Sequence, residues 1–238
     1  MLSDFLAGFA YLIGYFLLCV AFILPLRKLT KVPDEIFRKT LHFVLLCSLF
    51  VFVYAFKTWW LSALASLTFA LIVYPILAQA EKIEGFSALL TERKPGELKS
   101  SLIVVFIMFA VVISVCWGWL SDQLLVFACI FAWGFGDAAA ALVGKRFGKH
   151  HLTGKLIEGR KSIEGTLAMF AVSFLTVLVI LLIRGGLPWY GYLATALFAA
   201  AGCAATELYT LAGLDTITCP FAAAAIIIPL VLVWSGIV

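Results

Sequence analysis

Long apolar runs alternate with short polar connections along almost the whole chain. Each run has about the 17–25 residues that an α-helix needs to cross a bilayer. Polar and apolar residues do not alternate along these runs, as they would in a membrane-spanning β-barrel. The pattern therefore predicts an all-α, polytopic membrane bundle that forms a single domain over residues 1–238, with eight helices, or seven as the competing count. The eight predicted spans cover residues 5–26, 40–56, 58–78, 100–120, 123–143, 166–184, 188–208 and 217–236.

The composition agrees with a chain that lies mostly in lipid. It has 238 residues, of which 64% are hydrophobic and 13% are charged, whereas soluble domains have about 45–50% apolar and about 25% charged residues. The mean hydropathy is +1.13. A soluble enzyme with one membrane anchor is excluded, so any function must be built among the helices and their short connections. The first run is expected to be retained, because it lacks the basic leading segment and clear cleavage site of a signal peptide.

The charged residues are distributed unevenly between the two sides of the predicted membrane. Fifteen of the 17 lysines and arginines lie in the first, third and fifth connections, and only Lys57 and Arg184 lie elsewhere. The positive-inside rule places those three connections in the cytoplasm and both termini outside. This bias accounts for the net charge of +4 without a nucleic-acid partner. Eleven of the 13 acidic residues and all three histidines lie in or near these three connections or the seventh, which is on the same side. Their position predicts a polar site at the cytoplasmic face.

Asp137 is an acid inside an apolar run, about six residues before the predicted cytoplasmic end and so roughly 9 Å below the interface. A carboxylate in lipid needs a metal, a cation or a water-filled pocket. Mg²⁺ is commonly bound by one or two carboxylates together with substrate phosphates. We interpret Asp137 as a candidate Mg²⁺ ligand; the alternative is pairing with a nearby lysine for packing alone.

Glycines and cations follow directly in the sequence GKRFGK, from Gly144 to Lys149. Glycine lets a backbone amide approach a phosphate, and Lys145 and Lys149 would neutralise its charge. The alternative is a solvated basic loop. A Walker A motif is excluded, because the nearest similar run, residues 154–162, has an extra residue before its lysine and no preceding strand.

The sequence KSIEGT opens the sixth predicted span. Ser162 is a suitable N-cap, and the start of a helix attracts anions. Lys161 would add positive charge where a phosphate binds. Glu164 either complements the helix dipole, or is a second metal ligand, or is the partner that fixes Lys161.

Two further groups of polar residues mark other span ends. Arg38 and His42 are spaced i and i+4, so they share one helix face, with a snorkelling basic cluster as the alternative. Glu207 and Asp215 flank a cytoplasmic break that contains no basic residue. Their position favours a role as metal ligand or base, and the alternative is an ordinary loop with capping acids.

Taken together, these segments resemble the CTP-dependent lipid kinases, which include dolichol or polyprenol kinases, phytol kinases and CTP-using diacylglycerol kinases. The resemblance covers about residues 38 to 220, and its two middle segments are the specific ones. The matching segments are RKxxH at Arg38, Lys39 and His42, GDAAAALVGKRFGK from Gly136 to Lys149, KSIEGT from Lys161 to Thr166, and Glu207 followed by DTITCP from Asp215 to Pro220.

The resemblance implies transfer of the CTP γ-phosphate to a membrane alcohol at the cytoplasmic face, giving a lipid monophosphate and CDP. The alcohol would be a polyprenol or dolichol, a phytol-type prenyl alcohol, or diacylglycerol. Asp137 would hold Mg²⁺ with the assistance of Glu164 or Asp215, and Glu207, Asp215 or His42 would orient or deprotonate the hydroxyl. The phosphates would be bound among Lys145, Lys149, Lys161, Arg38, Lys39, Gly136, Gly144, Gly148, Ser162 and Thr218. A small protein of this kind is expected in a bacterial plasma membrane.

Two other readings compete with a lipid kinase. Phosphatidate cytidylyltransferases also use CTP and also carry a GD segment, but their characteristic C-terminal stretch is missing here. Transporters share intramembrane acids and broken helices. Against a transporter, the charges gather at one face instead of the midplane, and the sequence has no visible inverted repeat.

Overall fold

A computed structural model describes residues 1–30, 32–82, 96–152, 154, 157, 161–210 and 214–236. Within these residues it is built of helices, and its β-structure is limited to two isolated bridges, His151 with Ser162 and Gly154 with Ile157. Eight of the described helices are long and apolar enough to cross a membrane. The all-α, multi-pass prediction is therefore confirmed, at the larger of the two helix counts. The chain divides into two compact units, residues 1–119 and 120–238, which are described separately.

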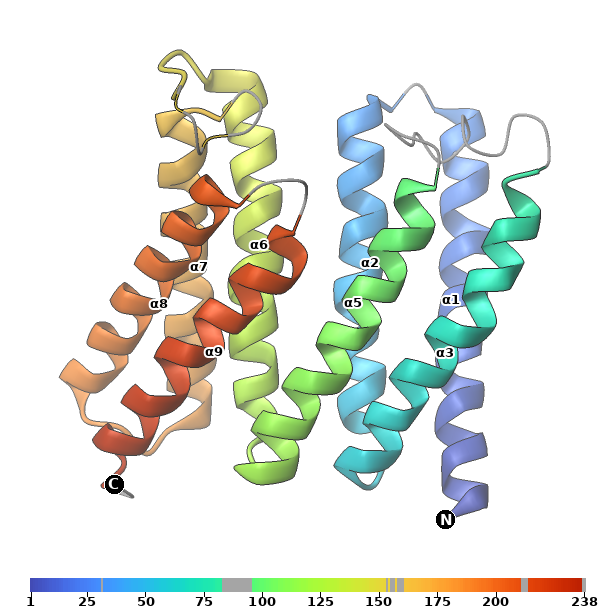
Figure 1. Ribbon diagram of the computed structural model, residues 1–238, viewed down its shortest axis with the longest axis horizontal. Helices are drawn as coiled ribbons and strands as arrows, with labels where there is room; N and C mark the ends of the chain where they lie inside the picture. The colour runs from blue at the N-terminus through green and yellow to red at the C-terminus, as the bar shows by residue number, and fades with distance from the viewer. Residues whose placement is uncertain are drawn as a thin grey trace. The chain divides into compact units, whose positions relative to one another are not determined.

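Phenylalanines form the core of the first unit, whose helices are labelled in Figure 1. Phe52, Phe69, Phe106 and Phe109 are buried and meet edge to face, with ring centroids 5.0–6.0 Å apart. Ser66 Oγ donates to the carbonyl of Phe106 at 2.7 Å, which joins two helices through a short polar side chain. The elements of this unit are α1 (Leu2–Leu29), α2 (Asp34–Tyr54), α3 (Trp59–Ala80), α5 (Glu97–Ile113) and the π-helical turn η1 (Ser114–Trp119).

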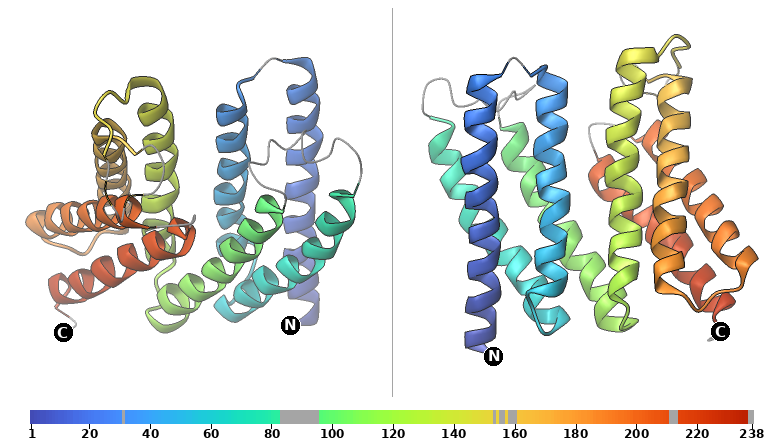
Figure 2. Two further views of the ribbon diagram at one scale, coloured as in Figure 1. Left: turned by 45° about the horizontal axis from the view of Figure 1, so that its top comes forward. Right: turned by 180° about the vertical axis from the view of Figure 1, so that it is seen from behind.

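The second unit contains the four remaining helices. Glycines allow α6 and α7 to approach closely, and the two lie side by side in Figures 1 and 2. A Cβ on Gly136 would lie only 2.4 Å from Ser173 Oγ, and one on Gly165 would lie 3.0 Å from the carbonyl of Ala140. Ser173 Oγ also donates across this interface to the carbonyl of Ala132 at 2.7 Å. The helices are α6 (Gln123–Phe147), α7 (Ile163–Arg184), α8 (Trp189–Tyr209) and α9 (Asp215–Trp234).

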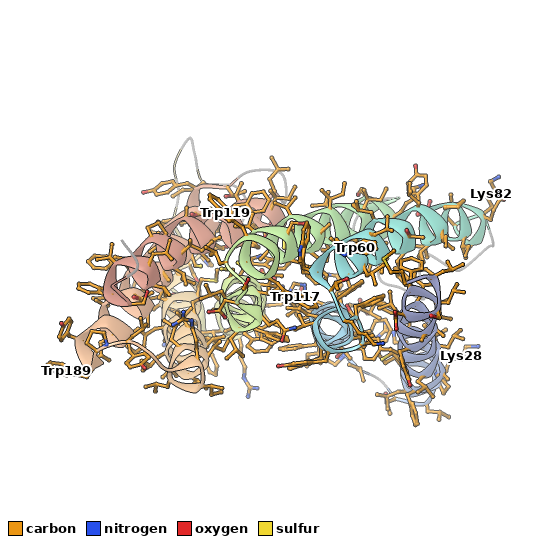
Figure 3. All side chains as sticks on the ribbon, turned by 90° about the horizontal axis from the view of Figure 1, so that it is seen from below. Lys28, Trp60, Lys82, Trp117, Trp119 and Trp189 are labelled. Atoms are coloured by element: carbon orange, nitrogen blue, oxygen red, sulfur yellow. The ribbon has the colours of Figure 1, made fainter. Side chains whose placement is uncertain are left out.

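Each unit has a basic end and an aromatic end, as a membrane protein should. In the first unit, Lys28 lies in the last turn of α1, whereas the tryptophans lie at the opposite end, at the start of α3 and in η1. Figure 3 shows the unit from this tryptophan end. In the second unit, the basic residues follow α6, whereas Trp189 begins α8 and Trp234 ends α9. This arrangement agrees with helices that cross the bilayer along their length.

Two predicted helix ends differ from the structure by four residues or more. α2 begins at Asp34, six residues before the predicted start at residue 40. α6 continues to Phe147, beyond the predicted end at residue 143. A helix needs backbone hydrogen bonds but not apolar side chains, so both helices extend into polar sequence that ends the hydrophobic run.

Candidate functional site

Four helix ends lie together at the basic end of the second unit. α6 ends and α7 begins there, and α8 ends and α9 begins there. Figures 1 and 2 show that α6 and the start of α7 project beyond the end of α8 and the start of α9. The site is therefore stepped: its projecting part carries the basic residues that end α6, and its lower part carries Glu207 and Asp215.

Lys161 is held against the end of α8. Its Nζ donates to the backbone carbonyl of Glu207 and lies 3.2 Å from Glu207 Oε1. Both side chains are largely buried, with 19% and 15% of their surface exposed. The last carbonyls of a helix have no partner within the helix, and they carry partial negative charge. Lys161 thus caps α8 through the backbone carbonyl of Glu207, and it also pairs with the carboxylate of Glu207.

Three carboxylates share this region: Asp137, Glu207 and Asp215, which we call the carboxylate cluster. Asp137 and Asp215 lie close enough to Glu207 for their charges to act on it. All three also act on Cys219, one turn into α9. Like charges gathered in a half-buried place repel one another unless a cation is near. The carboxylate cluster therefore concentrates negative charge at this end of the second unit, beside Lys161.

Asp137 lies deeper along α6 than the sequence suggested. It is ten residues before the last residue, Phe147, which corresponds to roughly 15 Å of helix. The added depth follows from the extension of α6 beyond the apolar run. Because α6 projects past α8 and α9, this depth brings Asp137 into electrostatic range of Glu207.

Glu164 contacts His150, at the start of the connection between α6 and α7. Glu164 Oε1 lies 2.8 Å from His150 Nδ1, and the backbone N–H of His150 donates to the same oxygen at 3.3 Å. The carboxylate therefore holds the connection onto the first turn of α7. The described part of the chain contains no group of three or more His, Cys, Asp or Glu side chains placed to hold a metal. That Asp137 holds Mg²⁺ with the assistance of Glu164 or Asp215 stays a prediction.

Ser162 caps α7, as predicted. Its Oγ accepts a hydrogen bond from the Gly165 amide at 3.1 Å, and the residue is buried. The backbone beside it is fixed as well, since the Leu152 amide donates to the Lys161 carbonyl at 2.8 Å. The start of α7 is therefore rigidly presented next to Lys161.

The glycines of GKRFGK have a packing role that the sequence did not indicate. Gly144 lies inside α6, and the Gly148 amide donates to the Gly144 carbonyl at 3.0 Å. A Cβ on Gly148 would lie 2.2 Å from that carbonyl and 2.8 Å from Ser162 Oγ. The expected phosphate-binding loop is therefore the end of a helix, whose amides bond along the helix. Lys145 and Lys149 remain exposed at this end.

A pair of threonines joins the end of α8 to the start of α9. Thr210 Oγ1 and Thr218 Oγ1 are 2.9 Å apart. Each also contacts a carbonyl four residues earlier, that of Thr206 at 2.6 Å and that of Leu214 at 3.0 Å. Thr218 was predicted as a phosphate ligand, whereas Thr210 was missed, because a lone threonine after a helix gives no signal in the sequence.

Arg38, Lys39 and His42 lie on α2, in the first unit. Arg38 Nη2 lies 2.9 Å from Glu35 Oε1, one turn earlier on the same helix. Lys39 is buried, and His42 is half-buried. These residues belong to the first two turns and a half of α2, so they form part of a regular helix.

Comparison with known proteins gives one informative similarity. No protein-family model matches the chain, and no solved structure matches it. The chain is 36% identical over 123 residues to a phytol kinase of Synechocystis sp., a match that covers 50% of this chain and 48% of that protein. The chain thus matches about half the length of that relative. This similarity supports the resemblance to CTP-dependent lipid kinases that the sequence motifs carry.

Proposed function

We propose that this protein is a lipid kinase that transfers the γ-phosphate of CTP to a prenyl-type alcohol at the cytoplasmic face of a bacterial plasma membrane. The observation that carries the proposal is the gathering of Lys161, the carboxylate cluster and the exposed Lys145 and Lys149 at one end of the second unit. The similarity to a phytol kinase favours a prenyl alcohol over diacylglycerol. It also favours a kinase over a cytidylyltransferase or a transporter.

The chemistry asked of such a site is mostly positioning and charge neutralisation. The acceptor oxygen would form a bond to the γ-phosphorus while the bond to the β,γ-bridging oxygen breaks, so that CDP leaves. The hydroxyl proton would pass to a basic side chain, for which Asp215 and Glu207 are the candidates in the second unit. Lys161 and the exposed Lys145 and Lys149 would bind phosphate oxygens.

Mg²⁺ fits the donor atoms that are present. It accepts one or two carboxylates and completes its coordination with phosphate oxygens and water, so it does not need three protein ligands. Asp137 and Asp215 are the side chains that would hold it. When bound, it would neutralise charge on the phosphates.

The test uses the purified chain in lipid nanodiscs with Mg²⁺ and a panel of phytol, polyprenol, diacylglycerol and phosphatidate. CTP carries the label either on the γ- or on the α-phosphate, and ATP serves as the comparison donor. We expect γ-label, but no α-label, in a prenyl alcohol. Transfer of the α-label would assign a cytidylyltransferase, and the absence of label from every lipid would overturn the proposal.

A further inference from the structure

We infer that Glu207 is a positioning residue for Lys161 and does not act as the base. This inference rests on the proposed function, since it assigns a role within the same site. Glu207 provides both the backbone carbonyl and the carboxylate that the lysine contacts. The sequence suggested Glu164 as the partner of Lys161, but the structure assigns that role to Glu207, 46 residues away.

The lysine ammonium has three hydrogens. Two of them face oxygens of Glu207, one on its backbone carbonyl and one on its carboxylate. Tetrahedral geometry directs the third N–H away from Glu207. An anionic ligand beside the first turn of α7 would accept this third hydrogen.

Both ends of the Lys161 side chain are fixed. The Lys161 carbonyl accepts from the Leu152 amide, and the next residue, Ser162, caps α7. A free lysine loses about 1.5–2 kcal/mol of rotamer freedom when it is ordered. Because Glu207 orders the ammonium before a ligand arrives, less of this cost falls on nucleotide binding.

Contact with Lys161 also limits what Glu207 can do as a base. Its Oε1 already faces the ammonium, and the side chain is only 15% exposed. A lipid hydroxyl that approached this oxygen would have to displace the lysine. Within the second unit, Asp215 is then the remaining candidate for the base.

Substitutions at Glu207 separate the two roles, because positioning needs reach whereas a base needs an ionisable group. Glu207→Gln keeps an acceptor at the same distance, while Glu207→Asp withdraws the carboxylate by about 1.5 Å. We expect Glu207→Gln to keep kcat within about threefold of the wild type and to raise the KM for CTP by about threefold to tenfold. Glu207→Asp should raise that KM by about tenfold or more.

A general base predicts the reverse order. Glu207→Gln would then lose about 10²- to 10⁴-fold in kcat with an unchanged KM, and Glu207→Asp would be the better enzyme. That outcome would overturn the inference. If the wild-type protein phosphorylates no lipid, the proposed function fails instead, so the two failures are distinguishable.

The second unit provides a matched control in the ion pair between Asp122 and Arg184. It joins α6 to α7 at the opposite end, with side chains 17% and 19% exposed. We expect Asp122→Asn to lower the melting temperature without changing the KM for CTP. An equal rise in KM for Asp122→Asn and Glu207→Asp would mean that loss of packing explains both, and the positioning role would be rejected.

Discussion

The two ends of the second unit use charge in opposite ways. At the aromatic end, one acid serves one base: Asp122 accepts from the Leu124 and Leu125 amides and from Arg184 Nε, the last at 2.5 Å. At the basic end, Glu207 pairs with Lys161, and two further carboxylates, Asp137 and Asp215, lie close enough to act on the charge of Glu207. The first arrangement satisfies its own charges and closes the bundle. The second concentrates like charge, which costs stability and is typical of a binding site.

Among the substitutions that test this difference between the two ends, Asp137→Asn is expected to have the largest effect. If the carboxylate cluster serves a Mg²⁺-bound nucleotide, the variant should lose about a thousandfold or more in kcat/KM, equivalent to about 4 kcal/mol. Phosphorylation rates check this expectation, and melting curves in detergent, measured side by side, show whether the variant is folded. A variant as active as the wild type would remove Asp137 from the site.

Arg184→Met tests the opposite end. The substitution leaves the Asp122 carboxylate largely buried and without the Arg184 guanidinium. Breaking a buried ion pair in this way lowers stability by about 3–5 kcal/mol. This is an upper value for a pair near a membrane surface. We expect a clear drop in melting temperature, with unchanged kcat and KM in the folded fraction. A selective loss of activity with normal stability would show that the two ends are not specialised as described.

Much of the fold could be predicted from local pattern, and so could part of the site. Long apolar runs gave the helices, and Ser162 was identified as a cap because an N-cap bonds to an amide within three residues. The end of α6 was misjudged because Gly144, Lys145 and Arg146 end the apolar run but remain helical.

The partner of Lys161 could not be predicted, because the pairing depends on how α7 packs against α8. Along the chain, Glu164 is three residues from Lys161, and Glu207 is 46 residues away. Sequence distance therefore favoured Glu164, which instead contacts His150. A similar limit applies to Gly136, whose small size is required by Met169 and Ser173 on α7.

Gly136→Ala and Gly144→Ala test whether these glycines serve packing or phosphate binding. A Cβ on Gly136 would lie 2.4 Å from Ser173 Oγ and 2.6 Å from Met169 Sδ, so we expect a cost of about 1–3 kcal/mol. On Gly144 the nearest atom is Ser162 Oγ at 3.3 Å, so the cost should be about 1 kcal/mol or less. If Gly144→Ala raised the KM for CTP at normal stability, its backbone would be a phosphate contact after all.

Thr210→Val is expected to have the smallest effect, and it shows whether the carboxylate cluster needs a fixed frame. Valine keeps the shape of threonine but removes the hydroxyl that meets Thr218 across α8 and α9. Losing this hydrogen bond should cost about 1 kcal/mol. Because Glu207 lies three residues before Thr210, and Asp215 three before Thr218, the KM for CTP should rise by about twofold to fivefold.

Thr40→Val on α2 is the matched control for this change. The Thr40 hydroxyl also donates to a carbonyl four residues earlier, that of Ile36 at 2.9 Å, but that bond stays within one helix. We expect Thr40→Val to leave the KM for CTP unchanged. If Thr210→Val behaves in the same way, the hydroxyl pair serves only to close the loop between α8 and α9. The carboxylate cluster would then be held by the packing of the helices below it, where Cys203 on α8 and Cys219 on α9 are both fully buried.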